Sequence, residues 1–325
     1  MKLPNYDDVL RPRERIAGKV VVTPVLRVPR LDALAGVELY LKAENLQRIG
    51  AFKARGAMNA VLALTPEARA RGLVTFSSGN HGQAVALAAK DASVASHIVM
   101  PEDAPLVKVD SIRALGGKVS FAGKTTDDRY RVACTIVEET GGTMIPPFDD
   151  AQVIAGQGTA TVELMEQAAA LGAVLDAVLV PVGGGGLLAG ACLAAEGHAS
   201  KPAVIAVEPA AADAFHKSHS ANERVTIAAQ ATIADGLRPV RVGELNFAIA
   251  HATVAHTVVV DDEAIGRALV ELLLHGKTLV EPSGACALAA ALERKLPPGV
   301  KRAGVILSGG NLAPAQLIGL LQKYG

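Results

Sequence analysis

Apolar and polar residues follow a pattern along the chain that is typical of α/β proteins. From about residue 37 onward, short apolar runs rich in β-branched residues alternate with longer segments of helical periodicity. The predicted strands are residues 37–44, 72–78, 96–101, 118–123, 177–183, 203–209, 256–262 and 303–310. Because strands that alternate with helices form βαβ units, we expect mainly parallel sheets in an α/β fold.

The spacing of these runs predicts a smaller α/β domain inserted into a larger one. The runs from residue 72 to residue 148 form a compact set of βα units that ends at the turn-rich segment GGTMIPPFDD. We assign residues 72–149 to the small domain, and residues 1–71 with 150–325 to the large domain. In open α/β sheets ligands bind beyond the carboxyl ends of strands, so functional residues are expected there.

The composition favours a cytoplasmic protein that acts on small molecules. Half of the 325 residues are hydrophobic, and 32 basic residues balance 32 acidic ones. A formal net charge of zero gives no electrostatic footprint for nucleic acid or an anionic membrane. The N-terminal stretch has no apolar core of signal-peptide length. The three scattered cysteines, Cys134, Cys192 and Cys286, suggest neither a disulfide framework nor a zinc site.

A run of four glycines follows the predicted strand at residues 177–183. The run consists of Gly183, Gly184, Gly185 and Gly186. Backbone N–H groups can converge there, and with the positive end of the following helix they form a cradle for a phosphate. With Ala189 and Glu208 the run also satisfies the dinucleotide fingerprint G-x-G-x-x-[GA]. A flexible turn whose glycines only permit close packing is the third interpretation.

Three further segments carry residues that could take part in binding or catalysis. In SSGNHG, residues 77–82, small hydroxyls and free N–H groups at a helix start can hold a substrate carboxylate, although plain N-capping by Ser78 or Asn80 is an equal alternative. In LSGGN, Ser308 lies at a strand end, which alone indicates a turn. In GAFKARGA, Lys53 follows Phe52 at a predicted helix start. Burial against apolar groups would lower the pKa of this lysine and favour its reactive neutral form.

Seven segments together resemble the fold type II pyridoxal-phosphate enzymes, and specifically the threonine/serine dehydratase and serine racemase family. They are GAFKARGA, SSGNHGQA, PPFDDAQVIAGQGT, VPVGGGGLLAG, TIADGL, EPSGA and LSGGN, in the family's order and approximate spacing over nearly the whole chain. The resemblance implies a two-domain fold like that of the tryptophan synthase β-subunit. It also implies pyridoxal 5'-phosphate as the cofactor and a homodimer.

The resemblance assigns most of these residues to the cofactor. Lys53 would bind it as an imine, and Phe52 would flank its ring. Asn80 would meet the phenolic oxygen, and Ser308 would hydrogen-bond the pyridine nitrogen. The other implied cofactor contacts are Gly183, Gly184, Gly185, Gly186, Leu187 and Glu281.

The resemblance assigns the substrate carboxylate to the SSGNHG turn. The implied contacts are Ser77, Ser78, Asn80 and His81. Ser78 would lie on the cofactor face opposite Lys53, where a second acid or base makes racemisation possible in addition to elimination. Arg129 falls where racemases carry a substrate-contacting arginine, although a lone arginine on a helix is more often solvated.

These assignments predict a lyase. A serine hydroxyl leaves the pyridine nitrogen largely neutral, which suits β-elimination, and Lys53 can remove the proton from the substrate Cα. We expect an ammonia-lyase that converts L-threonine or L-serine to a 2-oxo acid and ammonia. A 3-hydroxyaspartate ammonia-lyase and a serine racemase are the alternatives. A nicotinamide dehydrogenase would leave Lys53 and Ser308 without roles, and an amino-acid-binding protein without activity would not need Lys53.

The sequence departs from the racemase pattern at the cation site of that family. Several racemase-type relatives bind a divalent cation through a glutamate and an aspartate six residues later. Here Glu208 is followed at that distance by Ala214, with Asp213 one position off, so we expect no metal. His216 and His219 are spaced i, i+3, but an isolated pair on a polar helix is usually solvated.

Two other departures favour a dehydratase. Pro239 follows TIADGL where the racemase pattern has a small hydroxyl residue, and Phe148 in PPFDD is typical of dehydratases. The sequence given also ends soon after LSGGN, so we expect no feedback through an appended regulatory domain.

Overall fold

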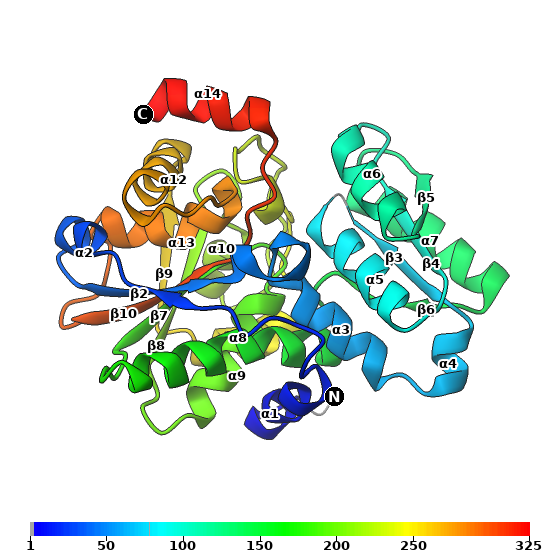
Figure 1. The fold of residues 1–325 in the computed structure, drawn as a ribbon, viewed down its shortest axis with the longest axis horizontal. Helices are drawn as coiled ribbons and strands as arrows, with labels where there is room; N and C mark the ends of the chain where they lie inside the picture. Colours follow the sequence, from blue (N-terminus) through cyan, green and yellow to red (C-terminus); the bar gives the residue numbers. More distant parts are fainter. Residues whose placement is uncertain (1–2, 78) are drawn as a thin grey trace.

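The structure, a computed structural model, describes residues 3–77 and 79–325 and contains two β-sheets (Figure 1). The strand order is β1-β2-β10-β7-β8-β9 in the six-stranded sheet and β5-β4-β3-β6 in the four-stranded sheet. Strands β1 and β2 pair antiparallel, and the other strand pairs of the described residues are parallel. The predicted α/β fold with mainly parallel sheets is confirmed.

The six-stranded sheet lies between two layers of helices. Its strands are β1 (Val25–Leu26), β2 (Glu38–Ala43), β7 (Ala177–Pro181), β8 (Ala203–Pro209), β9 (His256–Val260) and β10 (Arg302–Leu307). Helices α8 (Ala151–Ala170) and α9 (Gly186–Gly197) cover one face, while α12 (Asp262–Gly276) and α13 (Pro282–Leu292) lie on the other (Figure 1). All five residues of β7 are buried, as expected for a strand covered on both faces.

The four-stranded sheet lies to the right in Figure 1. Its strands are β3 (Leu73–Phe76), β4 (Ser96–Met100), β5 (Lys118–Phe121) and β6 (Thr143–Met144). Helices α5 (Asn80–Asp91), α6 (Leu106–Ala114) and α7 (Thr126–Thr140) pack around it. Strand β6 lies in the segment that the sequence indicated as a turn. The sequence did not predict this strand, because two residues are too few to show strand periodicity. That residues 72–149 form a separate domain stays a prediction.

The remaining elements connect or flank the sheets. They are α1 (Tyr6–Arg15), α2 (Pro29–Ala35), η1 (Glu44–Leu46), η2 (Arg48–Gly50), α3 (Lys53–Ala63), α4 (Pro66–Ala70), α10 (Ala214–Ala221), η3 (Asp235–Leu237), α11 (Glu244–Thr253) and α14 (Pro314–Tyr324). Helix α3 contacts both α8 and α5, so it joins the two sheets. None of the helices in residues 3–77 and 79–325 combines the length and apolar character needed to cross a membrane.

Glycines let helix α8 approach α3 on one side and α9 on the other. A Cβ atom at Gly156 would lie 2.7 Å from the Cα of Gly56 in α3, and a Cβ atom at Gly158 would lie 2.7 Å from the Gly190 carbonyl in α9. Real Cβ atoms do not approach backbone so closely, so both contacts require glycine. The three helices are therefore in backbone contact.

Candidate active site

Two segments that are far apart in the sequence pair at the carboxyl end of β10. Ala51 and Gly309 form an isolated antiparallel bridge, and the N–H of Phe52 donates to the carbonyl of Ser308 at 3.1 Å. Lys53 follows as the first residue of α3. The structure thus brings together the GAFK and LSGG segments, both of which the sequence singled out.

The ammonium group of Lys53 is partly desolvated. Its Nζ donates to the carbonyl oxygen of Pro147 at 2.6 Å and lies 5.2 Å from the centre of the Phe52 ring. Burial lowers the pKa of Lys53 to about 8. Since a lysine in water has a pKa near 10.4, a much larger share of this amine is neutral, and therefore nucleophilic, at physiological pH.

A buried network of ion pairs holds helix α3 in place. Arg55, two residues after Lys53, donates through Nε and Nη2 to Glu44 at 2.8 Å, and through Nη1 to Glu163 at 2.7 Å. The side chains of Arg55 and Glu44 are fully buried. Paired charges of this kind are costly to disrupt, because removal of one leaves the other buried alone.

Asn80 lies between Glu281, which precedes α13, and Asn311, which lies in the loop after β10. Its Nδ2 donates to Glu281 Oε1 at 2.8 Å, and its Oδ1 accepts from Asn311 Nδ2 at 2.9 Å. Asn80 is the first residue of α5, whose N-cap is Gly79, so the capping alternative for Asn80 is wrong. Sequence reasoning missed Asn311, although its amide in LSGGN was a signal that could have been used.

Glu281 precedes α13 and is almost fully buried. Burial raises the pKa of its carboxyl to about 7, and the nearby charge of Asp235 adds to this effect. The hydrogen bond from Asn80 and the charge of Lys108 act in the opposite direction. This carboxyl therefore titrates near neutral pH.

The glycine loop between β7 and α9 is tightly held. The carbonyl of Gly184 accepts from Asn246 Nδ2 at 2.8 Å and from the N–H of Gly243 at 3.0 Å. A Cβ atom at Gly184 would overlap the ring of Phe148. These contacts argue against a flexible loop, while the contact at Gly184 agrees with the close packing that the third interpretation gives to the glycines.

The same loop presents free backbone donors. Gly185, the N-cap of α9, has φ +94°, and no side chain of residues 3–77 and 79–325 caps the helix. The first N–H groups of α9, including those of Gly186 and Leu187, therefore have no partner within the helix. Such a helix start suits a phosphate.

Ser308 directly follows strand β10 and is bonded through its carbonyl to the segment that precedes Lys53. Its buried hydroxyl makes one weak hydrogen bond, of 3.4 Å, to the carbonyl of Ser283. A hydroxyl so weakly engaged can reorient toward a ring nitrogen.

The SSGNHG turn is described in part, since Ser78 lies outside the described residues. Ser77 Oγ accepts from the N–H of Gly79 at 3.1 Å. His81 Nε2 lies 3.0 Å from the carbonyl of Ile145, and because a carbonyl can only accept, Nε2 carries the proton and Nδ1 is an acceptor. Burial lowers the pKa of His81 to about 3, with the charge of Lys53 contributing, so the ring stays neutral.

Arg129 is buried, with 8% of its surface exposed, so the expectation of a solvated arginine is wrong. Its Nη1 donates to the carbonyl of Lys124 and its Nη2 to Thr126 Oγ1, both at 3.2 Å. These partners lie at the start of its own helix, α7. The hydrogen bonds of Arg129 thus stay at the start of α7, and its assignment to the substrate stays a prediction.

An ion pair that the sequence did not predict connects the two sheets. Lys108 Nζ in α6 lies 2.6 Å from Asp235 Oδ2 in η3. The same ammonium lies beside the substrate turn, because a Cβ atom at Gly79 would be 3.5 Å from it. Sequence reasoning did not assign a role to either partner, although Asp235 lies in TIADGL, one of the seven segments that carry the resemblance.

Glu208, the residue that corresponds to the cation-binding glutamate of the racemase pattern, has hydrogen-bond partners within the protein. The buried carboxylate of Glu208 accepts from the N–H groups of Phe215 at 2.8 Å and His216 at 2.7 Å, and burial raises its pKa to about 8. These two N–H groups are at the start of α10, so the carboxylate also serves the fold by binding that helix. His219 Nδ1 lies 3.1 Å from His251 Nδ1, so the two imidazoles bond each other.

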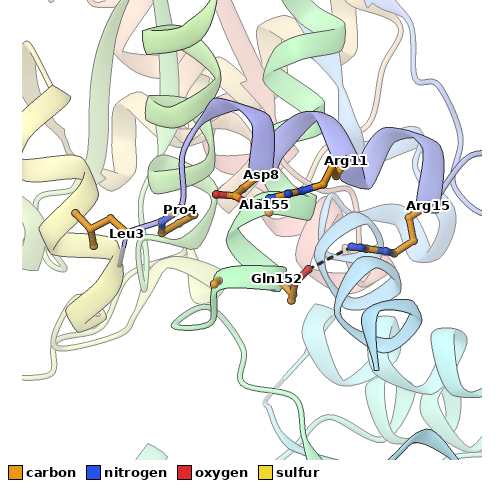
Figure 2. A pocket seen from close by; sticks show the side chains of 8 residues that line it. Leu3, Pro4, Asp8, Arg11, Arg15, Gln152 and Ala155 are labelled. Carbon is orange, nitrogen blue, oxygen red and sulfur yellow. Dashed lines mark hydrogen bonds and ion pairs between the residues drawn. The ribbon is translucent and has the colours of Figure 1, made fainter. Parts of the chain in front are cut away.

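A pocket of about 440 Å³ lies elsewhere, between α1 and the start of α8 (Figure 2). In it Asp8 pairs with Arg11, and Arg15 donates to Gln152 at 3.2 Å. Its charged side chains already have protein partners. None of the described residues that line this pocket belongs to the site around Lys53.

The residues around Lys53 form a donor set that fits a phosphorylated aldehyde ring. The amine can condense with the aldehyde, and the glycine loop can bind the phosphate. Asn80 and Ser308 offer an amide and a hydroxyl for polar atoms of the ring.

Comparisons with known proteins agree with this chemistry. A family model described as "Pyridoxal-phosphate dependent enzyme" matches residues 16–309. The chain is 42% identical over 312 residues to "L-threo-3-hydroxyaspartate ammonia-lyase" of Saccharomyces cerevisiae, covering 96% of this chain and 94% of that protein. It is also 42% identical over 310 residues to "Serine racemase" of Schizosaccharomyces pombe, covering 95% of each. A solved structure of a "Threonine deaminase" from "T.th." superposes with a TM-score of 0.90 at 44% identity, covering 95% of this chain and 99% of that chain.

Proposed function

Because the chain belongs to the family of pyridoxal-phosphate dependent enzymes, we propose that it is an ammonia-lyase for small β-hydroxy amino acids. The observation that carries the proposal is the buried amine of Lys53, whose pKa is about 8, beside donors for a phosphate and a ring. L-Threonine and L-serine are the first candidates. The products are a 2-oxo acid and ammonia. We also expect a homodimer, as the family resemblance implies.

A dicarboxylic substrate, 3-hydroxyaspartate, is the second candidate. Lys108 favours it, because its ammonium lies against the turn that is expected to receive the substrate carboxylate. A second carboxylate could pair with this cation. The similarity to a yeast enzyme named for this substrate supports the same candidate.

Pyridoxal phosphate, when bound, supplies an aldehyde that condenses with amines and a conjugated ring that accepts electrons from the substrate Cα–H bond. The N–H groups of the glycine loop would hold its phosphate. Ser308 would bond the ring nitrogen through a neutral hydroxyl, which leaves that nitrogen without a full positive charge. This moderate electron demand favours loss of a β-hydroxyl over reactions that need a long-lived carbanion.

Lys53 would carry out the proton transfer. Its lowered pKa lets the released amine accept the substrate Cα proton near neutral pH, and the Pro147 carbonyl orients the amine. His81, which stays neutral, adds no charge at the substrate turn. The N–H groups at the start of α5 are the donors left to hold the substrate carboxylate.

The absorption spectrum of the purified protein tests the cofactor, and product assays test the substrate. We expect a visible cofactor band that Lys53→Ala abolishes, together with ammonia and 2-oxo acid from threonine or serine. A colourless protein that is active only with NAD would refute the proposal. A preference for 3-hydroxyaspartate by more than about tenfold in kcat/KM, or ~1.4 kcal/mol, would select the second candidate. Formation of D-serine faster than pyruvate would instead make the protein a racemase.

A further inference from the structure

The residue four positions before Lys53 has an unusual backbone conformation. Ile49 in η2 has φ +58° and ψ 12°, in the left-handed region that β-branched residues rarely adopt. Such a conformation persists only where surrounding contacts hold it. The carbonyl of Ile49 accepts a hydrogen bond of 2.7 Å from Asn311 Nδ2. The strained residue thus points its carbonyl at an amide of the LSGGN segment.

This hydrogen bond determines how the Asn311 amide is turned. A carbonyl oxygen can only accept, so the nitrogen of Asn311 must face Ile49. The same nitrogen donates its second hydrogen to Asn80 Oδ1 at 2.9 Å. The Asn80 amide is therefore fixed as well, with its oxygen toward Asn311 and its nitrogen toward Glu281.

The fixed orientation leaves one hydrogen of Asn80 for another acceptor. Glu281 takes one N–H of Asn80 Nδ2, and the bonds of the described residues do not use the other. A flipped amide would instead direct its oxygen toward the cofactor. Two oxygen acceptors that face each other without a hydrogen repel, so the flip would be unfavourable at a phenolic oxygen.

We propose that Ile49 and Asn311 are positioning residues, which keep an N–H of Asn80 directed at the phenolic oxygen of the cofactor. The proposal rests on the proposed function, because Asn80 meets that oxygen only if pyridoxal phosphate binds here. Ile49 sets the direction through its backbone, and Asn311 transmits it to Asn80. An N–H at this oxygen stabilises the ionised phenolate, which absorbs visible light, over the neutral phenol, which absorbs in the near ultraviolet.

The test compares the bound cofactor's visible and near-ultraviolet absorbance in the holoenzyme over a pH series. In Asn311→Ala we expect the ratio to fall about twofold to tenfold, the equivalent of one hydrogen bond. In Asn311→Asp, which has the same size, we expect a larger fall. A carboxylate can only accept, so it would draw Asn80 Nδ2 toward itself. Unchanged ratios in both variants would overturn the proposal.

Two further variants complete the test. Asn5→Ala removes an exposed cap of α1, so it should lower stability while leaving the ratio unchanged. Ile49→Gly keeps the backbone carbonyl and adopts positive φ freely, so it should retain the wild-type ratio, and a fall as large as in Asn311→Ala would contradict the part given to Ile49. If Asn311→Ala does not fold, Asn311→Asp decides alone. A wild-type protein without a cofactor band would refute the proposed function rather than the positioning role of Ile49 and Asn311.

Discussion

The two sides of the site are built in different ways. On the cofactor side, backbone pairs with backbone at Ala51 and Gly309, and helices touch through glycines. On the proposed substrate side, the links that we describe to α13 and η3 are made by side chains, from Asn80 to Glu281 and from Lys108 to Asp235. Backbone contacts tolerate little displacement, whereas side chains can change partners. We therefore expect the cofactor side to be rigid and the substrate side to adjust.

The largest effect is expected where the buried network behind Lys53 is broken. Arg55→Met would leave Glu44 buried without its partner, so we expect a loss of about 3–5 kcal/mol in the free energy of unfolding. Denaturant unfolding measures this loss. Arg13→Met is the matched control, because Arg13 also binds a glutamate, Glu166, through two hydrogen bonds, but at the surface. The control should lose at most about 1 kcal/mol, and equal losses would argue against a rigid cofactor side.

A smaller effect is expected from crowding the glycine loop. Gly184→Ala would place a methyl group in the Phe148 ring, so we expect about 1–3 kcal/mol of destabilisation and weaker retention of the cofactor. Unfolding and dialysis against cofactor-free buffer measure the two effects. Gly319→Ala, with open space around its Cβ position, is the control. If the Gly184→Ala protein retains its cofactor as well as the control does, the loop can move to accommodate a methyl group and is not rigid.

Glu281 should make stability depend on pH. Its folded pKa of about 7 lies above its unfolded value near 4.5, so the folded state binds the proton more tightly in that interval. Stability should therefore fall as pH rises from about 4.5 to 7. The free energy of unfolding of Glu281→Gln minus that of the wild-type protein should be higher at pH 8 than at pH 5, by about 1–2 kcal/mol. Glu208 contributes with the same sign, so part of the slope should remain, and an unaltered slope would exclude Glu281 as its source.

The smallest effect is expected at the ion pair that crosses between the sheets. Asp235 is half exposed, so a double-mutant cycle of Lys108→Ala and Asp235→Ala should give a coupling of about 0.5–1 kcal/mol in stability. Lys108→Ala should nevertheless lower kcat/KM, most of all for 3-hydroxyaspartate. Arg113→Ala, which removes a surface pair on the same helix, is the control. If kcat/KM falls equally for all substrates, Lys108 does not select a dicarboxylate.

The sequence predicted what local composition can reveal. The strands, the four glycines and the Phe-Lys pair are marked by neighbours in the chain, and the structure brings Lys53 beside the Ser308 segment as the resemblance implies. Asn311 and Lys108 were missed, because their partners lie 231 and 127 residues away in the sequence. The expectation that Arg129 is solvated was wrong for a related reason, since its burial depends on the packing of α7 and not on its neighbours in the sequence.

The glycine contacts of α8 have a consequence for how such enzymes diverge. Helix α3 begins with Lys53, helix α9 begins at the glycine loop that we propose for the phosphate, and α8 touches both through backbone atoms. The spacing between the Lys53 amine and the glycine loop therefore depends on these glycines, because a side chain at Gly156 or Gly158 would push the helices apart. Substitutions around the SSGNHG turn would leave this spacing unchanged, whereas a substitution of Gly156 or Gly158 would alter it.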